Sequence, residues 1–351
     1  MSGAARYRPL GVFRFSLALL VVLQHFQHLL PAADRGVFSR MGFGAIAVCV
    51  FFTLSGFVVA EANAAFYAGR PGAFLVNRVI RVAPPYFAAL LLSALVQAGL
   101  FAGGHLVLWD YTLQGAPWAP ARLVSGVLAL VPGFNPRWFG QDFEFLPFVW
   151  SLRMEAAFYI SAALVLVAAR RWGGRVVAAG FVAGLLASGV FLLGGRPGAL
   201  STAPMFLFGV ALFGWQTRPD WARGMALAAS VGMAAWGFAS WRQHGAPVLG
   251  AQLALLGVLL AVFFWLASAR APRAFKRVDR TFGDLSYSLY LNHYVVGLVL
   301  TGLFAARGVA IYAVGVVISV ALAAGMARAV EAPLRRVRDR VRARERSCCR
   351  T

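Results

Sequence analysis

The sequence predicts an all-α protein, a polytopic membrane bundle of about ten transmembrane helices. Of the 351 residues, 60% are hydrophobic and only 13% are charged, and the mean hydropathy is +0.73. A water-soluble protein of this size exposes far more polar surface, and about 20 apolar residues in a row suffice to cross a bilayer. The net charge of +21 does not indicate a nucleic-acid partner, because the arginines cluster between apolar stretches and near the C-terminus.

Three apolar stretches long enough to span a membrane lie in the first hundred residues. The first, 11–30, follows a basic segment, as a signal peptide would, but it contains a glutamine and two histidines and has no small-residue cleavage site. The second is 44–67. We expect the third, 83–102, to start at Pro84 and Pro85, because proline favours the first turn of a helix.

The longest segment without a span, 103–146, is rich in Gly, Pro and Trp. We expect an external loop that covers a sugar-binding cleft, or alternatively an aromatic belt at the membrane interface. It carries Asp110, Asp142 and Glu144, and its apolar run 121–134 is too short to count as a span. The remaining predicted spans are, in chain order, 147–168, 176–194, 199–216, 223–241, 247–267, 284–305 and 309–330.

Ten spans place both termini on the same side of the membrane. With cytoplasmic termini, most of the 33 Lys and Arg residues lie beside cytoplasmic segments, as the positive-inside rule requires. The arginine-rich composition is typical of a GC-rich bacterial genome, so we expect the bacterial inner membrane. We expect one membrane domain over 1–334 and a basic cytoplasmic tail over 335–351 that contacts anionic lipids. The sequence leaves the oligomeric state open.

An arginine and a histidine lie eleven residues apart in the first predicted span. Because eleven residues make about three helical turns, Arg14 and His25 are expected on one helix face, roughly 16 Å apart along the axis. Ionisable side chains are costly in a bilayer and usually face the protein interior or a water-filled path. The separation is too long for a direct contact and suits one extended ligand that reaches both residues.

Two further arginines, Arg78 and Arg81, precede the third span. Their i, i+3 spacing places them on one helix face if that helix begins early. A forked guanidinium group suits phosphate oxygens, so these two residues and Arg14 are expected to bind an anionic ligand at the cytoplasmic mouth. The alternative for each arginine is positive-inside bias alone.

The segment that opens the fourth span carries Ser151, Glu155 and Tyr159 on one helix face. We expect Glu155 to lie at a depth similar to that of His25, where its carboxylate orients the imidazole. The alternative is a structural ion pair with Arg153 or with another buried arginine.

Several other polar side chains inside the spans are candidates for a substrate path, with hydrogen bonding between helices as the alternative role. The full set expected along the path is Ser55, Tyr86, Ser151, Tyr159, Tyr287 and His293. His25 and His28 are i, i+3 neighbours, but no third ligand lies at a useful spacing, so we expect no bound metal.

Taken in order, these segments resemble the acyltransferase-3 family of integral membrane O-acyltransferases. The resemblance covers most of the chain and rests on the order and spacing of elements that are each weak alone. The matching elements are the R-x10-H of Arg14 and His25, the FFxLSGF stretch 51–57, the R-x-x-R of Arg78 and Arg81 followed by Pro84-Pro85-Tyr86, Trp150-Ser151-Leu152 with Glu155 and Phe158-Tyr159, and Ser286-Tyr287 with Tyr290-Leu291 and His293.

The resemblance implies an enzyme that transfers an acyl group, often acetyl from acetyl-CoA, to a carbohydrate hydroxyl. By that likeness His25 is the essential histidine and Arg14, Arg78 and Arg81 are functional arginines. Acyl-CoA is then a substrate, no cofactor is held permanently, and the acceptor is a cell-envelope or exported carbohydrate or a lipid-linked sugar. The alternatives are a transporter or flippase of a lipid-linked sugar, which needs no thioester donor, and a non-catalytic scaffold.

Overall fold

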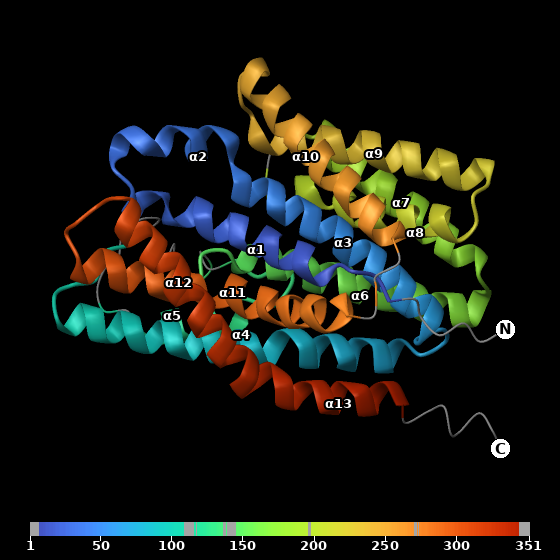
Figure 1. Cartoon of the computed structure of the whole chain (residues 1–351). Helices are drawn as coiled ribbons and strands as arrows, with labels where there is room; N and C mark the ends of the chain where they lie inside the picture. The colour runs from blue at the N-terminus through green and yellow to red at the C-terminus, as the bar shows by residue number, and fades with distance from the viewer. Residues whose placement is uncertain are drawn as a thin grey trace.

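The computed structural model describes residues 7–108, 116, 118–135, 138, 145–195, 198–269, 272 and 274–343, and within these ranges all regular structure is helical. The predicted all-α membrane bundle is confirmed, with long helices lying side by side along a common axis (Figure 1). The helices are α1 (Gly11–His25), α2 (Gly36–Met41), α3 (Phe43–Ala65), α4 (Pro71–Ala102), α5 (Pro120–Leu128), α6 (Val149–Trp172), α7 (Arg175–Leu193), α8 (Pro204–Thr217), α9 (Trp221–Arg242), α10 (Ala246–Ser268), α11 (Phe275–Leu303), α12 (Val309–Met326) and α13 (Ala332–Ala343).

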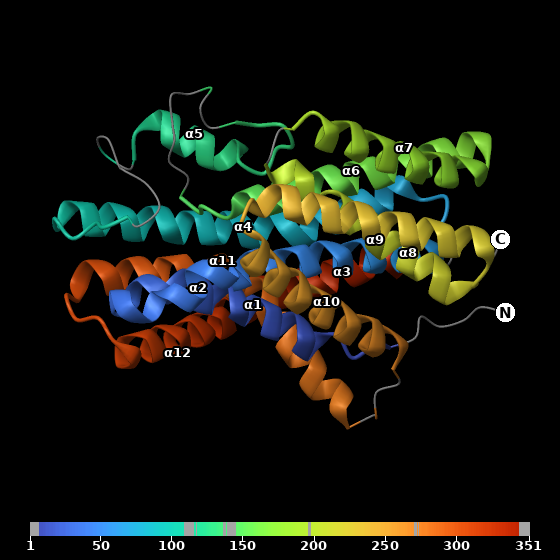
Figure 2. The same ribbon diagram turned by 90° about the horizontal axis from the view of Figure 1, so that it is seen from above.

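Each of the ten predicted spans coincides with a helix, and eight helical stretches of the described chain are long and apolar enough to cross a membrane. The two that fall short of this measure are α9 and α11, which have 22 and 29 residues and run alongside the others (Figure 2). In α11, residues 288–298 are buried inside the bundle, so the polar side chains of this stretch do not face lipid.

The start of α4 differs from the prediction, because the helix begins at Pro71 and passes through Pro84 and Pro85. Proline is tolerated inside membrane helices when neighbouring groups satisfy the backbone that it disturbs. The Tyr287 hydroxyl of α11 donates a hydrogen bond to the Val82 carbonyl oxygen in this turn, at 3.1 Å. The early start places Arg78 and Arg81 on the same helix.

The predicted boundary between membrane domain and basic tail falls inside α13, which continues the last span through a π-helical turn, Ala327–Glu331. This helix lies along the first part of α4, where the Asn77 side-chain amide donates to the Arg338 carbonyl oxygen at 3.1 Å. The part of the expected tail beyond Ala343 lies outside the described residues.

The core of the bundle is formed by α1 and α3, with α11 packed against α1 and α8 packed against α3. Glycine allows both close crossings. A Cβ atom on Gly11 would lie 1.8 Å from the Asp279 carbonyl oxygen, and one on Gly209 would lie 1.9 Å from the Thr53 carbonyl oxygen. Small residues at such crossings let membrane helices approach closely and gain van der Waals contact.

We therefore expect Gly209→Ala to destabilise the bundle by about 1–3 kcal/mol or more, because the added methyl group forces α3 and α8 apart. The measurement is the thermal unfolding midpoint in detergent. Gly257→Ala is the matched control in α10, where no atom lies within 4 Å of the added carbon. Equal midpoints for the two variants would contradict the close packing of α3 and α8.

Candidate active site

A cavity of about 70 Å³ lies inside the bundle and is walled by α1, α3, α4, α6 and α11. A smaller space of about 20 Å³ shares part of its lining, and we call the two together the arginine cavity. Eight residues selected from the sequence line it: Arg14, Ser55, Arg78, Arg81, Ser151, Glu155, Tyr159 and Tyr287. The structure thus brings together side chains from five helices.

The first turn of α1 is held by Asp279, a buried residue of α11. Its carboxylate accepts a hydrogen bond from the Val12 backbone N–H at 2.9 Å and another from the Tyr7 hydroxyl at 2.6 Å. Burial, together with the hydrogen bond to this carboxylate, raises the pKa of Tyr7 above its ordinary value, so the phenol stays protonated as a donor. Because a carboxylate caps the helix here, the position of Arg14 two residues later is fixed.

Three guanidinium groups, of Arg14, Arg78 and Arg81, meet in the arginine cavity. Arg78 is buried with its guanidinium over the rings of Phe74 and Tyr159, at 5.3 and 5.2 Å. Within the described residues, none of the three groups forms a hydrogen bond or a salt bridge, although they lie close enough to interact electrostatically. Guanidinium groups in a low-dielectric interior without a bound partner favour an anionic ligand.

Two carboxylates share this electrostatic environment. Glu155 accepts hydrogen bonds from the Ser55 hydroxyl, at 2.8 Å, and from the Tyr159 hydroxyl. Glu331 accepts one from the Ser288 hydroxyl, and both carboxylates interact with Arg14 and Arg81. Three cations against two anions leave one uncompensated positive charge at this end of the site.

His25 pairs with His293 of α11 rather than with a carboxylate. The Nδ1 atom of His25 lies 2.7 Å from the Nε2 atom of His293, and the ring of Phe148 is stacked against both imidazoles. In the part of the chain that the structure describes, no hydrogen bond joins Glu155 to His25, contrary to what the sequence had led us to expect. Because α1 ends at His25 whereas Glu155 lies in the second turn of α6, the carboxylate faces the cavity of Arg14.

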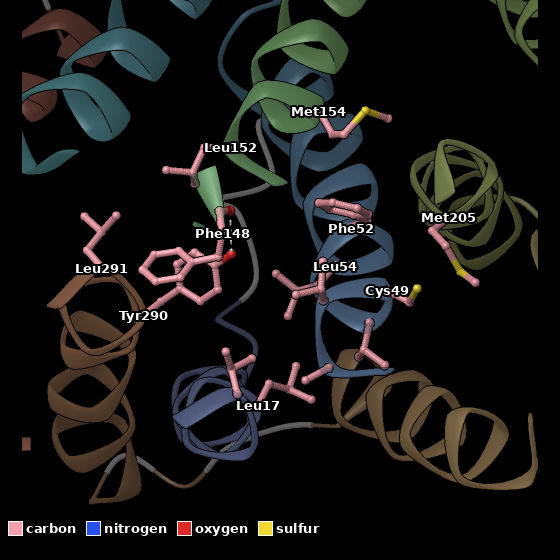
Figure 3. Close-up of a cluster of buried hydrophobic side chains, with 14 of the residues drawn as sticks. Leu17, Cys49, Phe52, Leu54, Phe148, Leu152, Met154, Met205, Tyr290 and Leu291 are labelled. Atoms are coloured by element: carbon pink, nitrogen blue, oxygen red, sulfur yellow. Dashed lines mark hydrogen bonds between the residues drawn. The ribbon is translucent and has the colours of Figure 1, made fainter. Parts of the chain in front are cut away.

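A layer of side chains links the arginine cavity to this histidine pair. Ser151 and Tyr290 line the cavity, their hydroxyl oxygens are 2.6 Å apart, and both hydroxyls are within hydrogen-bond distance of the Phe148 carbonyl oxygen. The Phe148 ring packs edge-on against Tyr290, with ring centroids 4.9 Å apart (Figure 3), and its centroid is 4.8 Å from that of His293 and 6.0 Å from that of His25. We call Phe148, Ser151 and Tyr290 the aromatic layer, because together they adjoin both the arginine cavity and the histidine pair.

Two predicted residues have structural contacts instead. The buried Tyr86 hydroxyl donates to the Gly126 carbonyl oxygen at 2.6 Å, which ties α4 to α5, and Tyr86 does not line the arginine cavity. Both ring nitrogens of His28 are engaged, one with the His25 carbonyl oxygen at 2.6 Å and one with the Thr301 hydroxyl at 2.9 Å. In the long loop, the acidic residues Asp110, Asp142 and Glu144 lie outside the described residues.

Glu331 is a site residue that the sequence reasoning missed. It ends the π-helical turn just beyond the last predicted span, and its partner Ser288 lies 43 residues earlier. π-Helical turns inside α-helices occur often at functional sites, because they re-aim a side chain. The sequence offered one sign of its role, because Glu331 is a single carboxylate at the end of an apolar span.

A family model described as an acyltransferase domain, acyltransferase 3, matches residues 10–328. The matched range contains the three arginines, Glu155, the histidine pair and the aromatic layer, and it ends three residues before Glu331. No curated protein and no solved structure gives a significant match to the chain.

Proposed function

The chain belongs to the acyltransferase-3 family and is a membrane acyltransferase, and we propose that it moves an acyl group, most simply acetyl, from acyl-CoA to a hydroxyl of a cell-envelope or exported carbohydrate. The observation that carries the donor assignment is the cluster of three guanidinium groups without hydrogen-bond or salt-bridge partners among the described residues. Acyl-CoA has phosphate groups that arginine guanidinium groups can bind, and its thioester lies at the other end of a long flexible arm.

The distance between the two functional groups supports this orientation of the donor. Arg14 and His25 both belong to α1, so they are about 16 Å apart along the helix axis. A donor whose phosphates contact the arginines can extend its thioester past the aromatic layer toward His25. The arm of the donor then runs beside the aromatic layer, so we expect these side chains to move when the donor binds.

The reaction that we propose uses His25 as a general base. Its imidazole takes the proton of the acceptor hydroxyl while that oxygen attacks the thioester carbonyl carbon. The tetrahedral intermediate collapses with cleavage of the C–S bond, and the imidazolium returns its proton to the leaving thiolate, which gives the acyl ester and free CoA. Transient transfer of the acyl group to His25 is the alternative route.

We propose that the protein lies in the bacterial inner membrane with the arginine end toward the cytoplasm. α1 begins and α13 ends at the same end of the bundle (Figure 1), as an even number of crossings requires. Basic residues are concentrated near that end, in agreement with the positive-inside rule. Acyl-CoA then enters from the cytoplasm, and His25, at the other end of α1, receives a carbohydrate or lipid-linked sugar from the external side.

The test uses purified protein in nanodiscs with radiolabelled acetyl-CoA and glycans extracted from cell envelopes. We expect release of free thiol that depends on the glycans, together with label that becomes bound to them as an ester. Protein without glycans and glycans without protein are the controls. Flux of a lipid-linked sugar across reconstituted vesicles without thiol release from any acyl-CoA would overturn the proposal.

A further inference from the structure

The hydrogen-bond partners of His25 and His293 determine which ring nitrogen of each residue carries a hydrogen. The Nδ1 atom of His293 lies 2.8 Å from the Tyr290 carbonyl oxygen and 3.3 Å from that of Leu289. A carbonyl oxygen can only accept a hydrogen bond, so Nδ1 of His293 carries the hydrogen. In a neutral imidazole the other nitrogen, Nε2, is then a bare acceptor.

The same reasoning continues to His25. Its Nδ1 atom is 2.7 Å from Nε2 of His293, and two bare nitrogens at that distance would repel each other. Nδ1 of His25 therefore carries a hydrogen and donates it to His293. This leaves Nε2 of neutral His25 as the bare nitrogen, and no hydrogen bond to that atom is found within the described residues.

We propose that His293 is a positioning residue that fixes His25 in the tautomer with hydrogen on Nδ1, so that Nε2 is the atom that accepts the substrate proton. The proposal rests on the acyl-transfer function and adds to it the identity of the basic atom and of the residue that selects it. Buried His293 is held by its bonds to the backbone of its own helix and by the Phe148 ring, so the acceptor has a fixed position.

The pair also determines how the charge is held during the reaction. When Nε2 of His25 takes the acceptor proton, both of its nitrogens carry hydrogen, and the Nδ1 hydrogen remains in the bond to His293. The new positive charge polarises a chain that runs from His25 through His293 to the Tyr290 carbonyl oxygen. Because the partner is a neutral imidazole, it stabilises the imidazolium less than a carboxylate would, which favours return of the proton to the thiolate.

Two substitutions separate positioning from packing. His293→Phe keeps the ring volume and removes the acceptor, and we expect kcat to fall by about 10–100-fold with little change in the KM for acyl-CoA. His293→Gln offers an amide oxygen at about the reach of Nε2, and we expect it to restore most of the loss. Thr301→Val is the control. Thr301 also belongs to α11, and its substitution removes a hydrogen bond to His28 but leaves the contact between His293 and His25 in place. Equal loss in both His293 variants would overturn the positioning role.

A second measurement needs no turnover and observes the wild-type histidine pair directly. The chain has five histidines, so ¹⁵N spectra of histidine-labelled protein in nanodiscs contain few signals. We expect His25, assigned by loss of its signals in His25→Gln, to show a protonated Nδ1 and a bare Nε2. A protonated Nε2 on neutral His25 would overturn the inference even if acyl transfer is found, whereas absence of acyl transfer would overturn only the proposed function.

Discussion

Replacing His25 by glutamine is expected to lower the rate of acyl transfer by about 10²- to 10⁴-fold, because an amide cannot take the proton of the acceptor hydroxyl. Glutamine keeps a polar side chain of similar length, so the bundle should remain folded. The measurement is thiol release from acetyl-CoA at saturating acceptor, with the unfolding midpoint recorded for the same preparations.

His28→Gln is the matched control for that substitution. His28 lies one helical turn from His25, but both of its ring nitrogens are engaged with neighbouring groups. We expect its activity to stay close to that of the wild-type protein. A His25→Gln variant that keeps full activity, or a His28→Gln variant that loses it equally, would rule out His25 as the general base.

The second large effect is expected at the arginine cavity. Arg14→Gln and Arg81→Gln should each weaken binding of acetyl-CoA by about 10–100-fold, the usual worth of a hydrogen bond to a charged group. Binding is best measured in the His25→Gln background, where turnover does not consume the ligand. Raising the salt concentration should weaken wild-type binding more than binding by either arginine variant.

Acetyl-pantetheine separates phosphate recognition from general damage to the site, because it carries the thioester arm without phosphate groups. We expect the arginine variants to bind it as well as the parent protein does. Arg328→Gln, which changes an exposed arginine of the last span, should leave the binding of both ligands unchanged. Equal weakening of acetyl-CoA and acetyl-pantetheine would refute a phosphate-binding role for Arg14 and Arg81.

The helices were predictable because membrane spans depend on local composition, and each of the ten predicted stretches coincides with a helix, eight of them apolar enough to cross a membrane. The start of α4 was not, since Pro84 and Pro85 lie inside the helix, and whether proline is tolerated there depends on packing between helices rather than on local composition. Arg78 and Arg81 were placed on one face because i, i+3 spacing is a local property.

The partner of His25 could not be derived from spacing. It lies 268 residues further along the chain, and nothing in the local pattern distinguishes His293 from a packing histidine such as His28. The choice of Glu155 assumed that two residues at similar depths in their spans would meet. However, α6 begins beside His25, directly after Phe148, so Glu155 lies about two helical turns further along α6 and contacts Ser55 and Tyr159 in the arginine cavity.

The aromatic layer has a consequence for the cell as well as for the substrate. An enzyme that binds its donor on one side of a membrane and its acceptor on the other needs an opening through the bilayer, which otherwise blocks the passage of protons. In the orientation that we propose, Phe148 and the hydrogen-bonded hydroxyls of Ser151 and Tyr290 adjoin both the cytoplasmic arginine cavity and the histidine pair. Donor and acceptor then enter from opposite sides, and we expect these side chains to limit the passage of protons and water between turnovers.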